Sequence, residues 1–313
     1  MSWTDADIPD QSDRTVLITG ANSGLGLRSA QALAAKGARV LLACRSPERG
    51  RQALHTVQAV AQTEPRLIKL DLADLGSVRQ TAAEVRELTG DALDVLMNNA
   101  GVMATPKGLT TDGFELQFGT NYLGPAALTW LLMPALRGGK DARVITMSSL
   151  AAHGGRLDLR DPNFEHRRYN PGVAYSQSKI ANQVFALELD RRLRADDEPV
   201  ISVAAHPGYT ATNLTSSMAR SYPNALVRSV VENVTRAGNF LLAQNVKTGA
   251  LPQLYAATAA GVNGGDYIGP ANFAHMRGAP TVVQPMRVAL DHATGIALWE
   301  LTAKLTGITP DPA

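Results

Sequence analysis

The sequence predicts an α/β fold, a doubly wound parallel sheet with helices on both faces. Polar or glycine-rich residues follow each predicted strand, and in parallel sheets the carboxyl ends of the strands form the ligand-binding crevice. The 313 residues are enough for one such domain with a sizeable core. Short apolar runs of strand length alternate with helical stretches, at residues 15–18, 38–44, 67–70, 93–97, 143–147 and 199–205.

The composition is that of an ordinary globular protein, with 45% hydrophobic and 19% charged residues. The net charge of +2 is spread along the chain, so we expect no nucleic-acid partner. Cys44 is the only cysteine, which excludes an intrachain disulfide and a cysteine-cluster metal site. Residues 1–14 do not resemble a signal peptide, and no apolar run reaches the ~20 residues of a membrane span. We therefore expect a cytoplasmic protein without bound metal.

The first predicted strand is followed at once by a glycine-rich turn and a helical stretch that reaches residue 35. Glycines allow a tight turn and let backbone amides approach a pyrophosphate, which the positive end of the helix attracts. The spacing G-x-x-x-G-x-G differs from the commoner G-x-G-x-x-G, and its position after a strand supports the interpretation. The residues expected to bind phosphate are Gly20, Asn22, Ser23, Gly24, Leu25 and Gly26.

The second predicted strand, residues 38–44, ends at Arg45. In a βαβ unit this position faces the adenosine ribose, where an acidic residue binds the 2′-hydroxyl. A guanidinium there suits a 2′-phosphate, which it can bind through two charge-assisted hydrogen bonds. The sequence thus favours NADP(H) as the cofactor, unless Arg45 is simply a surface arginine.

The third and fourth predicted strands also end in polar or small residues. Residues 67–70 lead into Asp71 and Leu72, and Asp71 could accept a hydrogen bond from the adenine amino group. A helical stretch at 74–88 separates this strand from residues 93–97, which run into Asn98, Asn99, Ala100 and Gly101. The two small residues would let the cofactor pass close to the backbone. The asparagines could equally be turn formers.

A helical stretch over residues 111–136 is expected to carry Asn121 in apolar surroundings, where its amide must find hydrogen-bond partners. The next strand, residues 143–147, ends in Ser148 and Ser149. A serine hydroxyl at a strand end can donate to the carbonyl oxygen of a substrate, although single serines there are more often turn or cap residues.

The run 175–179 is expected to open a helix. Tyr175 and Lys179 then lie four positions apart on one helix face, so that the phenol and the ammonium share one pocket. A neighbouring positive charge favours the phenolate and lowers the pKa of the tyrosine from about 10 towards the working pH, as proton transfer requires. This spacing is common in solvated helices, so the hypothesis depends on the other motifs.

The sixth predicted strand, residues 199–205, is followed by His206 and a turn-rich run suited to closing over the nicotinamide end of the cofactor. His206 itself is more readily explained as a structural histidine. After the turn, residues 213–245 carry apolar side chains at helical spacing that either line a lipophilic substrate pocket or pack on the core. The turn residues expected to bind the cofactor are Pro207, Gly208, Thr210 and Thr212.

Taken together and in this order, the motifs resemble the short-chain dehydrogenase/reductase family, which has a Rossmann fold. The resemblance covers residues 14–269 and rests on the glycine turn, residues 98–101 and 207–208, Asn121, Ser149, Tyr175 and Lys179. Finer detail is similar to the retinol dehydrogenase-like branch, which includes WW-domain oxidoreductases and resembles protochlorophyllide reductases. That detail lies in residues 43–45, 169–172, 206–208 and 298–301.

The resemblance implies a role for each matching residue. Tyr175 would be the general acid/base, and Lys179 would lower its pKa and bind the nicotinamide ribose. Ser149 would orient and polarise the carbonyl, because the family's serine is the second of such a pair. Asn121 would hold a water that connects Lys179 to solvent. The stretch between Ser149 and Tyr175 is longer than usual in the family, with residues 154–168 as the surplus.

We therefore expect an NADP(H)-dependent oxidoreductase that transfers a hydride between nicotinamide and a bulky, lipophilic carbonyl or alcohol. Two alternatives stay open: a catalytically silent NADP-binding regulatory protein, and a sugar-nucleotide epimerase or dehydratase. Residues 1–313 would form a single domain, with a cofactor-binding half at 14–110, a catalytic half at 111–270 and a C-terminal extension at 271–313. Family analogy and the apolar run at 184–189 also predict a homodimer.

Overall fold

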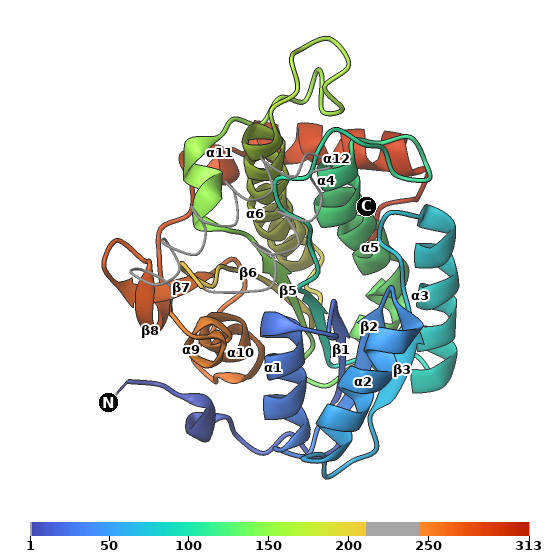
Figure 1. The fold of residues 1–313 in the computed structure, drawn as a ribbon, viewed down its shortest axis with the longest axis vertical. Helices are drawn as coiled ribbons and strands as arrows, with labels where there is room; N and C mark the ends of the chain where they lie inside the picture. Colours follow the sequence, from blue (N-terminus) through green and yellow to red (C-terminus); the bar gives the residue numbers. More distant parts are fainter. Residues whose placement is uncertain (1, 211–243, 313) are drawn as a thin grey trace, which may run out of the picture.

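The computed structural model describes residues 2–210 and 244–312. In this part of the chain an eight-stranded sheet has the order β3-β2-β1-β4-β5-β6-β7-β8 (Figure 1). All neighbouring strands are parallel except β7 and β8. The architecture confirms the predicted doubly wound, single-domain Rossmann fold. The strands are β1 (Thr15–Thr19), β2 (Arg39–Cys44), β3 (Arg66–Lys69), β4 (Val95–Asn98), β5 (Arg143–Met147), β6 (Ile201–Ala205), β7 (Tyr267–Asn272) and β8 (Arg277–Val282).

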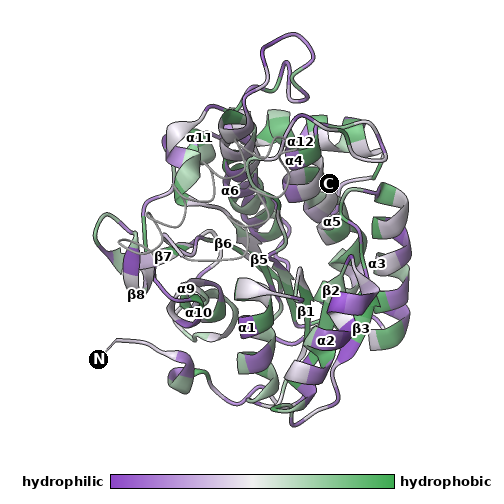
Figure 2. Ribbon diagram, in the orientation of Figure 1, coloured by the Kyte–Doolittle hydropathy of each residue, from purple (hydrophilic) through white to green (hydrophobic). Residues whose placement is uncertain are grey.

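Side chains alternate between the two faces of the sheet and build two cores. Leu17 belongs to one core, whereas its neighbours Val16 and Ile18 belong to the other. The first core is covered by α3 (Leu75–Thr89), α5 (Gly124–Arg137) and α6 (Pro171–Ala195). The second is covered by α1 (Gly24–Ala34), α2 (Pro47–Gln58), α9 (Val246–Gly249) and α10 (Leu251–Thr258). Figure 2 shows the hydrophobic central strands between these layers.

Helix α6 begins at Pro171, so the prediction that residues 175–179 open the helix is wrong. Asn170 is the N-cap, and its Oδ1 accepts from the backbone N–H groups of Gly172 (2.9 Å) and Val173 (3.1 Å). A capping asparagine followed by proline in the first turn starts a helix efficiently. Tyr175 and Lys179 consequently lie inside a formed helix.

The predicted helix over residues 111–136 is wrong at its start and interrupted near its middle. The chain becomes helical only at α4 (Leu116–Phe118), because the carboxylate of Glu115 caps the N–H groups of Gln117 and Phe118. A π-helical turn, η2 (Gly119–Leu123), then joins α4 to α5 and carries Asn121. Such turns are often found at functional sites.

The C-terminal extension adds β8, α11 (Arg287–Leu290) and α12 (His292–Thr306) to the sheet and its helices. Trp299 of α12 stacks on Phe185 of α6 with 5.5 Å between ring centroids, and lies edge-on to Trp130 of α5 at 4.8 Å. Tyr122 and Thr302 join η2 to α12 by a side-chain hydrogen bond. These elements were not predicted.

The homodimer prediction rested on family analogy and on the apolar run at 184–189, and the structure removes the second of these grounds. Val184, Phe185, Leu187 and Leu189 are each at most 7% exposed within one chain. The inference that this run exceeds what one helix buries is wrong, because α12 packs on α6 and supplies the missing surface.

Two further observations complete the fold. None of the helices in residues 2–210 and 244–312 is long and apolar enough to span a membrane. The same residues contain no group of three or more His, Cys, Asp or Glu that could hold a metal ion.

The proposed substrate segment at 213–245 lies almost wholly outside the described residues. The division of the domain into halves stays a prediction.

Candidate active site

The glycine turn packs against the end of β4 with no room for side chains. A Cβ at Gly26 would lie 2.5 Å from both the carbonyl oxygen of Gly20 and Nδ2 of Asn99. Gly20 has φ +67°, and a Cβ there would lie 2.9 Å from Cα of Ala100. Asn99 Nδ2 donates to the carbonyl oxygen of Thr19 (2.8 Å), and Thr19 Oγ1 accepts from the N–H groups of Asn99 and Ala100 (3.0 Å each). Asn99 therefore fixes the turn.

A cleft of about 270 Å³ opens beside this turn, at the carboxyl ends of β1, β2 and β4. It brings together most of the residues predicted to bind the cofactor: Gly20, Asn22, Ser23, Gly24, Leu25, Gly26, Arg45, Asp71, Leu72, Asn99, Ala100 and Gly101. Sequence reasoning missed eight further lining residues: Ala43, Ser46, Arg49, Leu70, Val102, Met103, Thr105 and Thr120.

The end of the cleft that is predicted to bind adenosine has two arginines rather than one. Arg45 follows β2, and Arg49 lies in the first turn of α2, whose N-cap Ser46 accepts from the N–H of Arg49 (3.3 Å). Both arginine residues are exposed. Arg49 could have been recognised in the sequence as a second basic residue, four positions after Arg45. Across the cleft, Asp71 Oδ1 accepts from the N–H of Ala73 (3.0 Å), so its predicted contact with adenine stays a prediction.

Lys179 and Tyr175 are buried together at the start of α6, but their ionisation differs from the prediction. Nζ of Lys179 donates to the carbonyl oxygen of Met147 (2.9 Å) and lies 6.0 Å from the centroid of the Tyr175 ring. Burial lowers the pKa of Lys179 to about 8. Burial also raises the pKa of Tyr175, and a hydrogen bond with Ser149 opposes that rise. The net shift of the Tyr175 pKa is upward, opposite to the predicted lowering, because desolvation outweighs the other contributions.

The two serines after β5 have different partners. Ser149 is the N-cap of η3 (Leu150–Gly154), where its Oγ accepts from the N–H of Ala151 (3.2 Å), and it lies beside the Tyr175 phenol, where it opposes the rise of the Tyr175 pKa. Ser148 is buried, and its Oγ donates to the carbonyl oxygen of Lys179 (2.8 Å). Only Ser149 therefore lies beside the phenol, which supports the choice of Ser149 over Ser148.

Asn121 joins the loop after β4 to helix α6. Its Oδ1 accepts from the N–H of Val102 (2.7 Å), and its Nδ2 donates to the carbonyl oxygen of Val102 (2.9 Å) and to Oγ of Ser178 (2.9 Å). A Cβ at Gly101 would lie 3.2 Å from Asn121 Oδ1 and 3.5 Å from Lys179 Nζ, so Gly101 connects the cleft to the lysine. Because both polar side-chain atoms of Asn121 have protein partners, its water-holding role stays a prediction.

The turn after β6 is held by close contacts, and its described residues, 206–210, are not among those that line the cleft. Gly208 has φ +66°, and a Cβ there would lie 2.3 Å from the carbonyl oxygen of Met276. Thr210 Oγ1 donates to the carbonyl oxygen of Pro207 (2.8 Å). His206 Nδ1 accepts from the N–H of Gly208 (3.2 Å), and burial lowers the His206 pKa to about 3, as suits a neutral structural histidine. Thr212 lies outside the described residues.

The sequence model of the family described as short chain dehydrogenase matches residues 14–223. The chain belongs to the short-chain dehydrogenase family. This short-chain dehydrogenase is 36% identical over 300 residues to "Retinol dehydrogenase 13" of Homo sapiens, covering 94% of this chain and 85% of that protein. It is 36% identical over 307 residues to "Polyprenol dehydrogenase" of Mus musculus, covering 96% and 86%. These matches confirm the resemblance to the retinol dehydrogenase-like branch.

Solved structures agree with this assignment. A crystal structure of an uncharacterized protein from Mycobacterium Paratuberculosis has a TM-score of 0.80 and 42% identity, and the match covers 98% of each chain. The Pseudomonas aeruginosa RhlG/NADP active-site complex has a TM-score of 0.62 at 23% identity, covering 82% of this chain and 94% of that one, and shares the fold. This short-chain dehydrogenase is accordingly an oxidoreductase, and its family uses NAD(P)(H).

Proposed function

We propose that this short-chain dehydrogenase is an NADP(H)-dependent oxidoreductase that interconverts a bulky, lipophilic alcohol and its carbonyl compound. The observation that carries the proposal is the contact between the half-buried Ser149 and the buried Tyr175, with Lys179 one helical turn away. A hydroxyl donor and a phenol at one point can hold a carbonyl oxygen and exchange a proton with it.

The residues of the cleft fit a dinucleotide. Gly20, Gly24 and Gly26 of the turn present backbone without side chains, and a Cβ at Gly26 would fill the space against Gly20 and Asn99. Arg45 and Arg49 would bind a 2′-phosphate with charge-assisted hydrogen bonds, which supports NADP(H) over NAD(H). When bound, the nicotinamide donates or accepts the hydride.

The proton is handled by the chain's own side chains. In reduction, the hydroxyl groups of Ser149 and Tyr175 would donate to the carbonyl oxygen, and the Tyr175 proton would pass to it as negative charge develops. The ammonium of Lys179, 6.0 Å from the ring, stabilises the resulting phenolate in a site almost without water. In oxidation the same phenolate removes the proton of the alcohol. Burial of Tyr175 and Lys179 keeps the interaction between them strong.

The lipophilic substrate class is supported by two facts. The relatives described above are named for retinol and polyprenol, which are long apolar alcohols. The sequence of residues 213–245 carries apolar side chains at helical spacing, among them Leu226, Val230 and Val234. Pockets for small molecules are mostly apolar with few placed polar groups, and Ser149 and Tyr175 would be those groups here.

The test is NADPH oxidation with aldehydes and ketones, including a series of aldehydes of increasing chain length. Each buried methylene should add about 0.8 kcal/mol to transition-state binding, close to fourfold in kcat/KM. Tyr175→Phe should bind NADPH normally and lose about 10²–10⁴-fold in rate. Tight NADPH binding without turnover of any compound would instead support a regulatory protein. A flat chain-length series would remove the lipophilic substrate class alone.

A further inference from the structure

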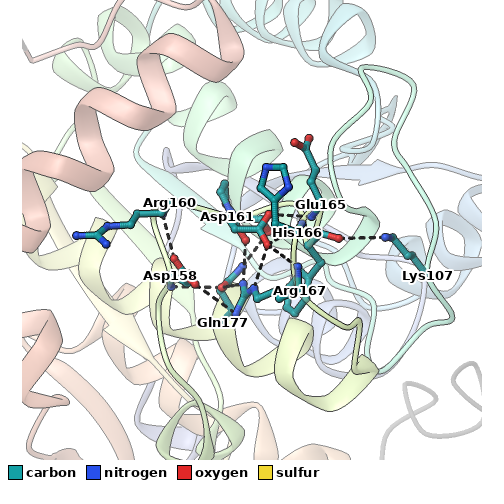
Figure 3. A network of polar contacts seen from close by, with 10 residues as sticks. Lys107, Asp158, Arg160, Asp161, Glu165, His166, Arg167 and Gln177 are labelled. Carbon is teal, nitrogen blue, oxygen red and sulfur yellow. Dashed lines mark hydrogen bonds and ion pairs between the residues drawn. The ribbon is translucent and has the colours of Figure 1, made fainter.

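The long segment between Ser149 and Tyr175 is wrapped around one side chain of α6. We call residues 155–168 the insertion loop. Gln177 is fully buried, and its Oε1 accepts from Nη2 of Arg167 (2.6 Å) and from the N–H of Asp158 (3.3 Å). Its Nε2 donates to the carbonyl oxygen of Pro162 (2.9 Å). One amide thus binds the insertion loop near its start, middle and end (Figure 3).

Arg167 is the second centre of this network. Its guanidinium lies 3.8 Å above the centroid of the Phe164 ring and donates to the carbonyl oxygen of Asp161 (3.0 Å). The carboxylate of Asp161 in turn accepts from the N–H groups of Glu165 (2.8 Å), His166 (3.2 Å) and Arg167 (3.2 Å). The loop contains no helix or strand, so these side chains replace the hydrogen bonds that regular structure would provide.

Both ends of the insertion loop lead directly to the proposed catalytic residues. At its start, a Cβ on Gly155 would lie 2.4 Å from Cβ of Ser176, so the backbone that leaves Ser149 and η3 rests on α6 next to Tyr175. After its end, the Tyr169 hydroxyl donates to the carbonyl oxygen of Thr105 (2.9 Å), a residue of the cofactor cleft. The insertion loop is the covalent path from Ser149 to Tyr175.

We propose that Gln177 and Arg167 are positioning residues, which clamp the insertion loop to α6 and thereby hold Ser149 beside the Tyr175 phenol. The inference rests on the proposed function, since it assigns these residues a role in the same proton transfer. Gln177 lies two positions from both Tyr175 and Lys179, but it serves the loop that carries Ser149. The surplus length of this segment is therefore a support for the site.

The experiment compares Gln177→Ala and Arg167→Ala with the wild type in steady-state kinetics. Misplacement by about 1 Å can cost about 10²-fold in rate, so we expect kcat to fall at least about tenfold, while KM for NADPH changes less than about twofold. The Ser149 hydroxyl lowers the Tyr175 pKa, and the ammonium of Lys179 lies 6.0 Å from the centroid of the Tyr175 ring. The pH limb assigned to Tyr175 should therefore move to higher pH in both variants.

Arg168→Ala is the matched control, because Arg168 is the exposed neighbour of Arg167 in the same loop. Arg167→Lys, which keeps a cationic donor for Gln177 Oε1, should recover part of kcat and of the pH profile. If Gln177→Ala does not fold, the proposal is tested by Arg167→Ala alone, because Arg167 is only half-buried. A lower Tm with unchanged kcat and pH profile would overturn the proposal. It fails separately from the proposed function, which is lost if the wild type turns over no compound or if Tyr175→Phe turns over normally.

Discussion

The ammonium of Lys179 donates to the carbonyl oxygen of Met147 at 2.9 Å, and Nδ2 of Asn182 donates to the same oxygen, also at 2.9 Å. Lys179 is 5% exposed, and burial lowers its pKa from 10.5 to about 8. At neutral pH the folded protein therefore holds a positive charge in a poorly solvated place. A group kept there against its solvation preference is typical of a functional site.

Lys179→Met should stabilise the cofactor-free protein while it abolishes turnover. One pKa unit corresponds to about 1.4 kcal/mol, so removing the buried charge should raise the free energy of unfolding by about 1–3 kcal/mol at pH 7. Met147 keeps Asn182 as its donor. Between pH 8 and 10.5 the unfolded chain binds more protons at Lys179 than the folded protein does, so the stability of the wild type should rise as the pH rises over that window.

Urea unfolding measures the stability of the variant and the pH dependence of the wild type, with Lys140→Met, at an exposed position, as the control. A destabilised Lys179→Met would contradict this account.

Arg45→Asp should reverse the proposed preference of the enzyme for NADPH over NADH. A hydrogen bond to a charged group contributes roughly 1.5–3 kcal/mol, about tenfold to a hundredfold in affinity. Arg49→Ala should weaken NADPH and leave NADH binding unchanged, because Arg49 lines the same end of the cleft. Fluorescence titration of each cofactor measures these constants, and the exposed Arg51 of the same helix provides the control variant Arg51→Ala. Equal wild-type affinity for both cofactors would refute the role of Arg45.

His206 should make the fold less stable at mildly acidic pH. Burial lowers its pKa from 6.5 to about 3, so between these values the unfolded chain binds the proton and the folded protein does not. From pH 7 to pH 5 this group should remove about 2 kcal/mol from the free energy of unfolding. His206→Gln should flatten that pH dependence, whereas His55→Gln, at an exposed position, should not. Identical pH slopes for wild type and His206→Gln in urea unfolding would show that His206 is solvated.

Helix α12 should keep the face formed by α5 and α6 from pairing with a second copy. Trp299 is 3% exposed and contacts the rings of Phe185 and Trp130, so Trp299→Ala should lower the free energy of unfolding by about 3–5 kcal/mol.

Light scattering of the full chain at micromolar concentration should give the mass of the monomer. Glu300→Ala, on the exposed side of α12, should change neither quantity. A dimeric wild type would contradict the expectation.

The alternation of strands and helices could be predicted from the sequence because hydrophobic periodicity is local. The glycine turn, Arg45 and residues 99–101 could be placed on one cleft because the carboxyl ends of β1, β2 and β4 meet at one edge of a parallel sheet. The start of α6 could also have been found from Asn170 and Pro171, which are local capping signals.

What only the tertiary structure decided depends on contacts between distant residues. Ser148 and Ser149 are equivalent in the sequence, and their partners on α6 distinguish them. The pKa of Tyr175 depends on burial, which no spacing of residues reveals. The sequence by itself determined that the face formed by α5 and α6 is apolar. Only the tertiary structure decided that the chain's own C-terminal helix covers this face, because the covering contacts join residues as far apart as Tyr122 and Thr302, 180 positions away.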